Sequence, residues 1–108
     1  MTPIDDKLIE NVTKTIVENF NPRRIVLFGS HARGEGGPDS DLDVIVEMET
    51  EDTVRQAIEI LKTFGLRDWA MDLLVYTPAQ YARQQKIIGT LPSMIAGEMR
   101  ILYERSAE

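Results

Sequence analysis

Hydrophobic positions near the start of the chain follow a helical period. Between residues 4 and 20 an apolar side chain recurs every four positions, at Ile4, Leu8, Val12, Ile16 and Phe20. This spacing predicts an amphipathic helix whose apolar stripe packs on a core. Thr2-Pro3 is suited to cap this helix and Asn21-Pro22 to end it. The branched apolar run at residues 24–28 ends at a glycine and predicts a buried strand.

Two later segments alternate between polar and apolar side chains, which is the pattern of a strand. In residues 41–48 one face carries only apolar side chains, which are Leu42, Val44, Val46 and Met48. The other face carries Asp41, Asp43, Ile45 and Glu47. We therefore expect one face to lie on the core and the other to face a site. Residues 70–76 predict a further strand, in which Asp72, Leu74 and Tyr76 share a face.

The remaining helices are predicted from apolar spacing and from the residues that typically begin or end a helix. Apolar spacing predicts a helix from about Val54 to Phe64, which Gly65 is placed to end. Residues 77–80 have the sequence of a capping box and predict a helix to about Ile88, followed by a short helix and a strand around residues 100–103. This order predicts an α/β (α+β) fold, a small mixed β-sheet with helices packed mainly on one face, in a single domain over residues 1–108.

Composition narrows the classes of function. The chain has 18 acidic and 12 basic residues, and its net charge of −6 argues against direct binding of a polynucleotide backbone. It contains no cysteine, which excludes disulfides, thiolate metal sites and a thiol nucleophile, and fits a cytoplasmic protein. No apolar run in the sequence approaches the roughly 20 residues that span a bilayer, so we expect no membrane association.

The glycine-rich segment that follows the first predicted strand does not match three common ligand-binding motifs. Gly29 and Gly34 have the spacing of P-loop glycines, but Glu35-Gly36 stand where a lysine and a hydroxyl residue are required. A calcium loop fails because its glycine and bidentate glutamate positions hold valine and threonine. A dinucleotide fingerprint lacks its third glycine.

Three aspartates remain as candidate functional residues after these motifs are excluded. Asp41 and Asp43 are two positions apart on a predicted strand, so their side chains project from the same face and can share divalent cations. Asp72 adds a carboxylate on the third predicted strand, among apolar neighbours. We therefore expect a metal-dependent phosphate chemistry.

The motif FGSHARG, followed by SDLDVIV, resembles the nucleotidyltransferase superfamily typified by DNA polymerase beta. The similarity is greatest to its smallest members, the minimal nucleotidyltransferases, which share the order of helix, strand, Gly-Ser turn, double-Asp strand, helix and third-Asp strand. The resemblance implies that ATP is the substrate and that two Mg²⁺ ions stabilise the attacking and leaving oxygens. The implied catalytic residues and metal ligands are Asp41, Asp43 and Asp72.

The resemblance also implies a set of nucleotide-binding residues. Gly29 would let the backbone approach the triphosphate, and Ser30 would donate to its β- or γ-phosphate. Arg33 would pair with phosphate oxygens, although it could instead form a salt bridge with the acidic loop. Ser40 is assigned to nucleotide binding as well, with a turn hydroxyl as the alternative. His31, the only histidine, is expected to face solvent.

Another protein is expected to supply the acceptor, because residues 1–108 leave no room for the acceptor domain of larger superfamily members. Minimal nucleotidyltransferases pair with a helical HEPN-domain toxin, a ribonuclease, and act as its antitoxin by transferring AMP from ATP to a tyrosine. The resemblance implies this function here. Two alternatives stay open: a non-catalytic antitoxin that binds and masks the toxin, and nucleotidyl transfer to a small molecule.

Overall fold

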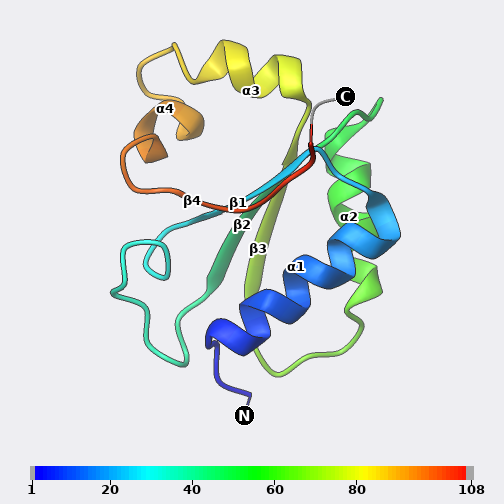
Figure 1. The fold of residues 1–108 in the computed structure, drawn as a ribbon, viewed down its shortest axis with the longest axis vertical. Helices are drawn as coiled ribbons and strands as arrows, with labels where there is room; N and C mark the ends of the chain where they lie inside the picture. The colour runs from blue at the N-terminus through cyan, green and yellow to red at the C-terminus, as the bar shows by residue number, and fades with distance from the viewer. Residues whose placement is uncertain (1, 107–108) are drawn as a thin grey trace.

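The computed structural model describes residues 2–106. Its elements follow the predicted order and are shown in Figure 1: α1 (Asp6–Phe20), β1 (Arg24–Phe28), β2 (Leu42–Glu47), α2 (Thr53–Thr63), β3 (Met71–Tyr76), α3 (Pro78–Gln84), α4 (Leu91–Ile95) and β4 (Arg100–Glu104). No helix in this part of the chain is both long and apolar enough to cross a membrane.

The four strands form one mixed sheet in the order β3-β2-β1-β4. β1 runs antiparallel to both of its neighbours, whereas β2 and β3 are parallel. A parallel pair needs a crossover connection, which α2 provides. The predicted mixed sheet is therefore confirmed, and its central strands β1 and β2 bring distant segments of the chain together.

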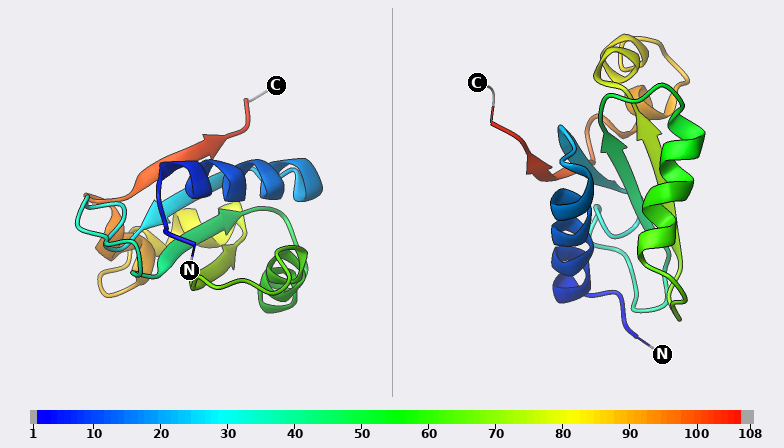
Figure 2. Two further views of the ribbon diagram at one scale, coloured as in Figure 1. Left: turned by 90° about the horizontal axis from the view of Figure 1, so that it is seen from below. Right: turned by 90° about the vertical axis from the view of Figure 1, so that its right-hand side faces the viewer.

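The main core lies between the sheet and the two longer helices. Side chains of α1 and α2 pack against the inner face of the strands, and this cluster includes Ile9, Val12, Ile16, Ile25, Leu27, Val44, Val46, Ile60, Leu73 and Val75. Figures 1 and 2 show α3 and α4 lying together at one end of the sheet. There they cover a second, smaller cluster formed by Val26, Ile45, Tyr81 and Ile95.

This second cluster corrects one expectation for β2. The face that carries Asp43 was expected to face a site along its whole length, but Ile45 on that face is fully buried. The physical reason is that α3 and α4 follow β3 and pack back over this end of the sheet. Only the Asp43 end of that face is left for a site.

Two helix ends differ from their predicted positions. α1 is capped by Asp5, whose side chain accepts from the N–H of Leu8, and not by Thr2-Pro3. The preceding residues stay extended because the N–H of Ile4 donates to the carbonyl of Pro38 at 3.1 Å. α3 begins with the predicted capping box at Thr77 but ends at Gln84 and does not reach Ile88.

The early end of α3 has a local cause. The single hydroxyl hydrogen of Thr90 is shared between the carbonyls of Gln84 and Ile87, whose oxygens lie 2.6 and 2.8 Å from Oγ1. The same hydroxyl accepts from the N–H of Ser93 at the start of α4. One threonine therefore ends α3 and caps α4.

A nearly buried ion pair joins β1 to the far end of β2. Nε of Arg24 donates to Oε2 of Glu47 at 2.8 Å, and the two side chains are 16% and 10% exposed. The guanidinium also lies over the ring of Tyr81, 4.7 Å from its centroid. The charge of Glu47, the only charged residue among the buried ones described, is thus compensated by a planar cation that is itself packed.

Replacing Glu47 with glutamine should lower the free energy of unfolding by about 2 kcal/mol, because the Arg24 charge would then be buried without its partner. The matched control is Glu18→Gln, which breaks the exposed Lys14–Glu18 pair on α1. That change should cost less than about 0.5 kcal/mol. Urea denaturation at pH 7 measures both, and equal losses would contradict this account of the Arg24–Glu47 pair.

Candidate functional site

The turn after β1 requires a glycine at position 29. Gly29 has a φ of 77°, in the left-handed region that favours glycine. It also faces Asp43, the residue that pairs with Phe28 across β1 and β2. A Cβ at position 29 would collide with Oδ2 of Asp43 and lie 3.1 Å from its Cγ. The backbone of the Gly-Ser turn is therefore packed directly against the Asp43 carboxylate.

The chain then makes one helix-like turn. The N–H groups of Ala32 and Arg33 both donate to the carbonyl of Gly29, at 3.1 and 3.2 Å. The N–H of Glu35 donates to the carbonyl of Ser30 at 2.9 Å and closes the turn. Ser30 is half-buried at the start of this turn, beside Gly29. The structure thus places Gly29 against Asp43, and Ser30 follows it in the same turn.

Asp43 and Asp72 are direct neighbours on the parallel strands β2 and β3. Burial, followed by the negative charge of Asp72 and hydrogen bonding with its carboxyl group, raises the pKa of Asp43 from 3.8 to about 6. Two carboxyls held in this way favour either a shared proton or a cation between them.

Asp41 lies just before β2 and is exposed, as is Asp72. Its charge also contributes to the raised pKa of Asp43, so all three carboxyls act on the same region. Within residues 2–106, no three acidic or histidine side chains form a group that could hold a metal ion as they stand. The assignment of Asp41, Asp43 and Asp72 as metal ligands stays a prediction.

The chemistry of these side chains nevertheless suits a hard divalent cation. Carboxylate oxygens are the protein ligands that Mg²⁺ prefers. A cation beside Asp43 would also offset the repulsion that raises its pKa. Asp43 is fixed by its contact with Gly29, whereas the exposed Asp41 and Asp72 can turn toward an ion. The residues therefore fit Mg²⁺ in chemical type.

Arg33 is held by two acidic side chains. Its Nε donates to Glu35 at 3.1 Å and its Nη1 to Glu98 at 3.2 Å. Hydrogen bonds with these two carboxylates raise the pKa of Arg33 above its usual value. The sequence left a salt bridge with the acidic loop open as an alternative, and the structure shows that pairing. The contact with Glu98, between α4 and β4, had no signal in the sequence. Both pairs are exposed, so a phosphate could displace them.

Ser40 and His31 connect the two ends of the glycine-rich loop. The hydroxyl of Ser40 accepts from the N–H of Gly37 at 3.0 Å, so it serves as the turn hydroxyl that the sequence left open. Nε2 of His31 lies 3.2 Å from the carbonyl oxygen of Ser40, and it must donate because a carbonyl only accepts. The expectation that His31 faces solvent holds only in part, since the residue is half-buried and its ring packs against Gly36. The glycine at position 36 is the signal that could have revealed this packing.

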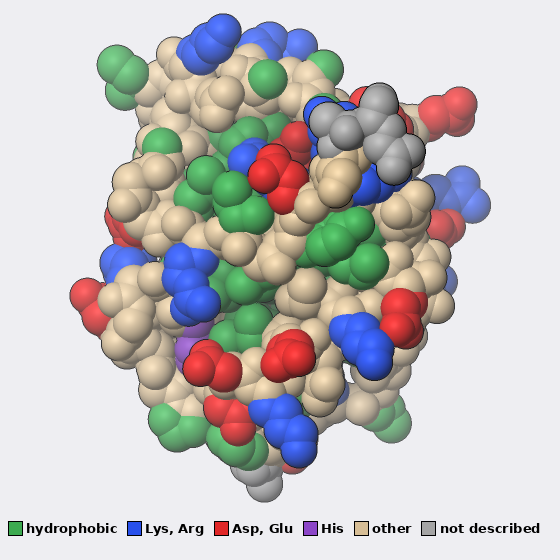
Figure 3. Space-filling view, viewed as in Figure 1, with side chains coloured by type: hydrophobic (Ala, Val, Ile, Leu, Met, Phe, Trp, Pro, Cys, Tyr) green, Lys and Arg blue, Asp and Glu red, His purple; other side chains and the backbone are tan. Residues whose placement is uncertain are grey.

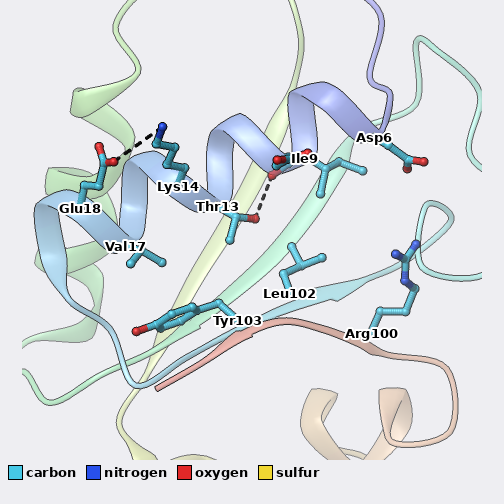
Figure 4. A pocket seen from close by; sticks show the side chains of 10 residues that line it. Asp6, Ile9, Thr13, Lys14, Val17, Glu18, Arg100, Leu102 and Tyr103 are labelled. Atoms are coloured by element: carbon cyan, nitrogen blue, oxygen red, sulfur yellow. Dashed lines mark hydrogen bonds and ion pairs between the residues drawn. The ribbon is translucent and has the colours of Figure 1, made fainter. Parts of the chain in front are cut away.

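A separate groove of about 550 Å³ lies between α1 and β4. Figure 4 shows Tyr103 facing Val17 across it, with Leu102 pointing toward Thr13 and Ile9. Figure 3 shows charged side chains of both signs around hydrophobic ones on this face. The groove is lined by residues of α1 and β4, and not by Asp41, Asp43 or Asp72. The candidate site is therefore identified from its carboxylates and glycine turn and not from the size of a hollow.

Known proteins resemble this chain in sequence and in fold. The chain matches the family model of the nucleotidyltransferase domain over residues 9–94. It is 36% identical over 69 residues to a Methanocaldococcus jannaschii protein provisionally named protein adenylyltransferase MJ1215, covering 63% of this chain and 72% of that protein. It is 40% identical over 47 residues to protein adenylyltransferase MntA of Thermococcus cleftensis, covering 44% of this chain and 48% of MntA. The second match thus spans about half the length of its relative.

Two solved structures share the fold. A provisionally named nucleotidyltransferase from Sulfolobus solfataricus has a TM-score of 0.62 at 19% identity, over 92% of this chain and 79% of its own. A toxin-antitoxin structure with AMP-PNP has a TM-score of 0.55 at 22% identity, over 90% of this chain and 74% of its own. The predicted fold class is confirmed by these likenesses. The Gly-Ser turn and the double-Asp strand are in place, and the family model matches residues 9–94, which is most of this chain. The chain therefore belongs to the nucleotidyltransferase domain family.

Proposed function

We propose that this nucleotidyltransferase transfers AMP from ATP to a tyrosine of a HEPN-domain ribonuclease toxin, with Mg²⁺ as cofactor, and so acts as its antitoxin in the cytoplasm. The observation that carries the proposal is the contact of Asp43 with Gly29 on one side and Asp72 on the other. This arrangement joins a phosphate-approaching turn to a pair of carboxylates. The names of the relatives, protein adenylyltransferases, and the toxin-antitoxin structure with AMP-PNP support the choice of reaction and partner.

The chain's own residues have distinct parts in this reaction. The acceptor oxygen forms a bond to the α-phosphorus of ATP, and the bond from that phosphorus to pyrophosphate breaks. Ser30 and the Gly29 backbone hold the leaving phosphates, and Asp72, which is exposed, takes the acceptor proton. Asp41, Asp43 and Asp72 would hold Mg²⁺, which supplies positive charge to the attacking and leaving oxygens.

A second candidate is a non-catalytic antitoxin that masks its toxin by binding alone. The ion pairs of Arg33 with Glu35 and Glu98 favour it, because they occupy the guanidinium that a phosphate would need. Against it stands the unfavourable proximity of Asp43 and Asp72, which a pure binding surface has no use for. Transfer to a small molecule has no such structural observation in its favour.

Incubation with ATP, Mg²⁺ and a HEPN toxin should give a toxin that carries added AMP on a tyrosine, detected by mass spectrometry. Asp43→Asn should reduce the rate of transfer by at least about 100-fold, because several kcal/mol of charge stabilisation are lost. Asp39→Asn removes a charge from the same loop and is the matched control, with an expected change below about threefold.

The two candidate functions separate on these variants. If Asp43→Asn still binds the toxin but no longer neutralises it, catalysis is supported. A wild-type protein that adds no AMP at saturating ATP would contradict the enzymatic proposal. Neutralisation of the toxin by Asp43→Asn as well as by the wild type would also contradict it, and would favour the masking function.

Stability without divalent cations should fall as pH rises through the titration of Asp43. Its pKa is about 6 in the folded chain and near 3.8 in the unfolded chain, so the folded state binds more protons between these values. The contribution of Asp43 to the free energy of unfolding is fully present below about pH 4 and lost above about pH 6. This change is on the order of 1 kcal/mol after allowance for solvent screening.

Thermal unfolding from pH 4 to pH 8 measures this effect, with Asp43→Asn as the reference that lacks it. The difference between wild type and variant should shrink when Mg²⁺ and ATP are added, because cations offset the repulsion around Asp43. If the melting temperatures of wild type and Asp43→Asn change in parallel with pH, with and without Mg²⁺, then Asp43 does not have a raised pKa in the folded protein.

A further inference from the structure

His31 forms a cross-link within the loop that separates β1 from β2. It follows Gly29-Ser30 at one end of the loop, and its Nε2 donates to the carbonyl of Ser40 at the other end, at 3.2 Å. Ser40 directly precedes Asp41. A single side chain thus joins the turn expected to hold phosphate to the segment that carries the aspartates.

The loop is built to accept the imidazole ring. A Cβ on Gly36 would lie 2.5 Å from Nδ1 of His31 and 2.6 Å from its Cγ, so any side chain at position 36 would displace the ring. Gly36 has no left-handed φ that would require glycine for its own backbone. The ring therefore accounts for the glycine, and the glycine leaves the ring in one position.

Other hydrogen bonds hold the two ends of the cross-link. The N–H of Glu35 donates to the carbonyl of Ser30, and the hydroxyl of Ser40 accepts from the N–H of Gly37. The loop is therefore ordered on both sides of the His31 contact. The β1–β2 pairing of Phe28 with Asp43 holds the base of the loop, and the His31 hydrogen bond adds a further link between the Ser30 turn and the Ser40 turn.

We propose that His31 is a positioning residue, whose hydrogen bond to the Ser40 carbonyl fixes the Gly29-Ser30 turn relative to Asp41 and Asp43 so that the nucleotide phosphates align with the carboxylates. This inference rests on the proposed nucleotidyl transfer. His31 does not need to touch the substrate in this role. Displacement of the phosphate grip by about 1 Å relative to the reacting centre is enough to slow a reaction about 100-fold.

Replacement of His31 by glutamine and by asparagine tests the hydrogen bond. The Nε2 of glutamine is as many bonds from Cβ as the Nε2 of histidine, so it can reach the Ser40 carbonyl, whereas the amide of asparagine is one bond short. His31→Asn and His31→Ala should lower kcat for AMP transfer about 10- to 100-fold with less than about a threefold change in KM for ATP. His31→Gln should recover most of the rate.

Two adjacent glycines supply a matched pair of variants. Gly36→Ala should displace the ring and reproduce the kcat loss of His31→Ala. Gly37→Ala should behave as wild type, because its Cβ would meet Asp39 Oδ1 at 3.5 Å and Ser40 Oγ at 3.8 Å, which are ordinary contacts. If Gly36→Ala and Gly37→Ala lose activity to the same extent, or if neither loses activity, the role assigned to the His31 ring is wrong.

A measurement that needs no acceptor separates this inference from the proposed function. Backbone hydrogen exchange in residues 36–41 should increase in His31→Asn and Gly36→Ala, and stay at the wild-type level in His31→Gln and Gly37→Ala. Melting temperatures should remain within a few degrees of wild type for all four. A wild-type protein that transfers no AMP contradicts the proposed function, whereas unchanged exchange in His31→Asn, or activity losses that follow the melting temperature, contradict the role of His31.

Discussion

The structure depends on the placement of two carboxylates side by side on parallel strands. Asp43 and Asp72 are paired in the register of β2 and β3, and Asp43 is also packed against the Gly29 backbone. Burial of Asp43, together with the negative charge of Asp72 beside it, raises the pKa of Asp43 to about 6. Such a pair is maintained because the surrounding fold fixes it, and a cation bound beside it would relieve the repulsion.

The two ends of β2 each carry a carboxylate, and within the described residues only one of the two is compensated by a cationic side chain. Glu47 and Asp43 are four residues apart on the same face of that strand. At one end, Glu47 is compensated by Arg24, whose guanidinium lies over the ring of Tyr81. At the other end, Asp43 meets a second carboxylate and a glycine. The compensated end is covered by α3 and contributes to the fold, while the uncompensated end is open and available for chemistry.

Much of this could be predicted from the sequence because the patterns are local. The four-residue period of α1, the alternation in β3 and the capping box at Thr77 each predicted an element that the structure contains. The spacing of Asp41 and Asp43 predicted a shared face, and the motif predicted their association with Gly29 and Asp72. Strand pairing then made Asp43 and Asp72 neighbours.

The features that the sequence did not reveal depend on contacts between distant residues. The pairing of Arg33 with Glu98 spans 65 positions, and no period or motif connects them. The start of α1 was misplaced because Ile4 is held by the carbonyl of Pro38, which keeps the preceding residues extended. His31 was expected in solvent because its partner is a backbone carbonyl, which has no signature in side-chain type.

The pKa of the Asp43 carboxyl, measured by NMR titration with and without Mg²⁺ and ATP, tests the central claim most directly. The account predicts a value near 6 in the free protein, and a fall toward the ordinary value for aspartate when Mg²⁺ and ATP bind. A value near 4 in the free protein, or one that Mg²⁺ and ATP leave unchanged, would contradict the conclusion that Asp43 and Asp72 form a cation-dependent nucleotidyl-transfer site.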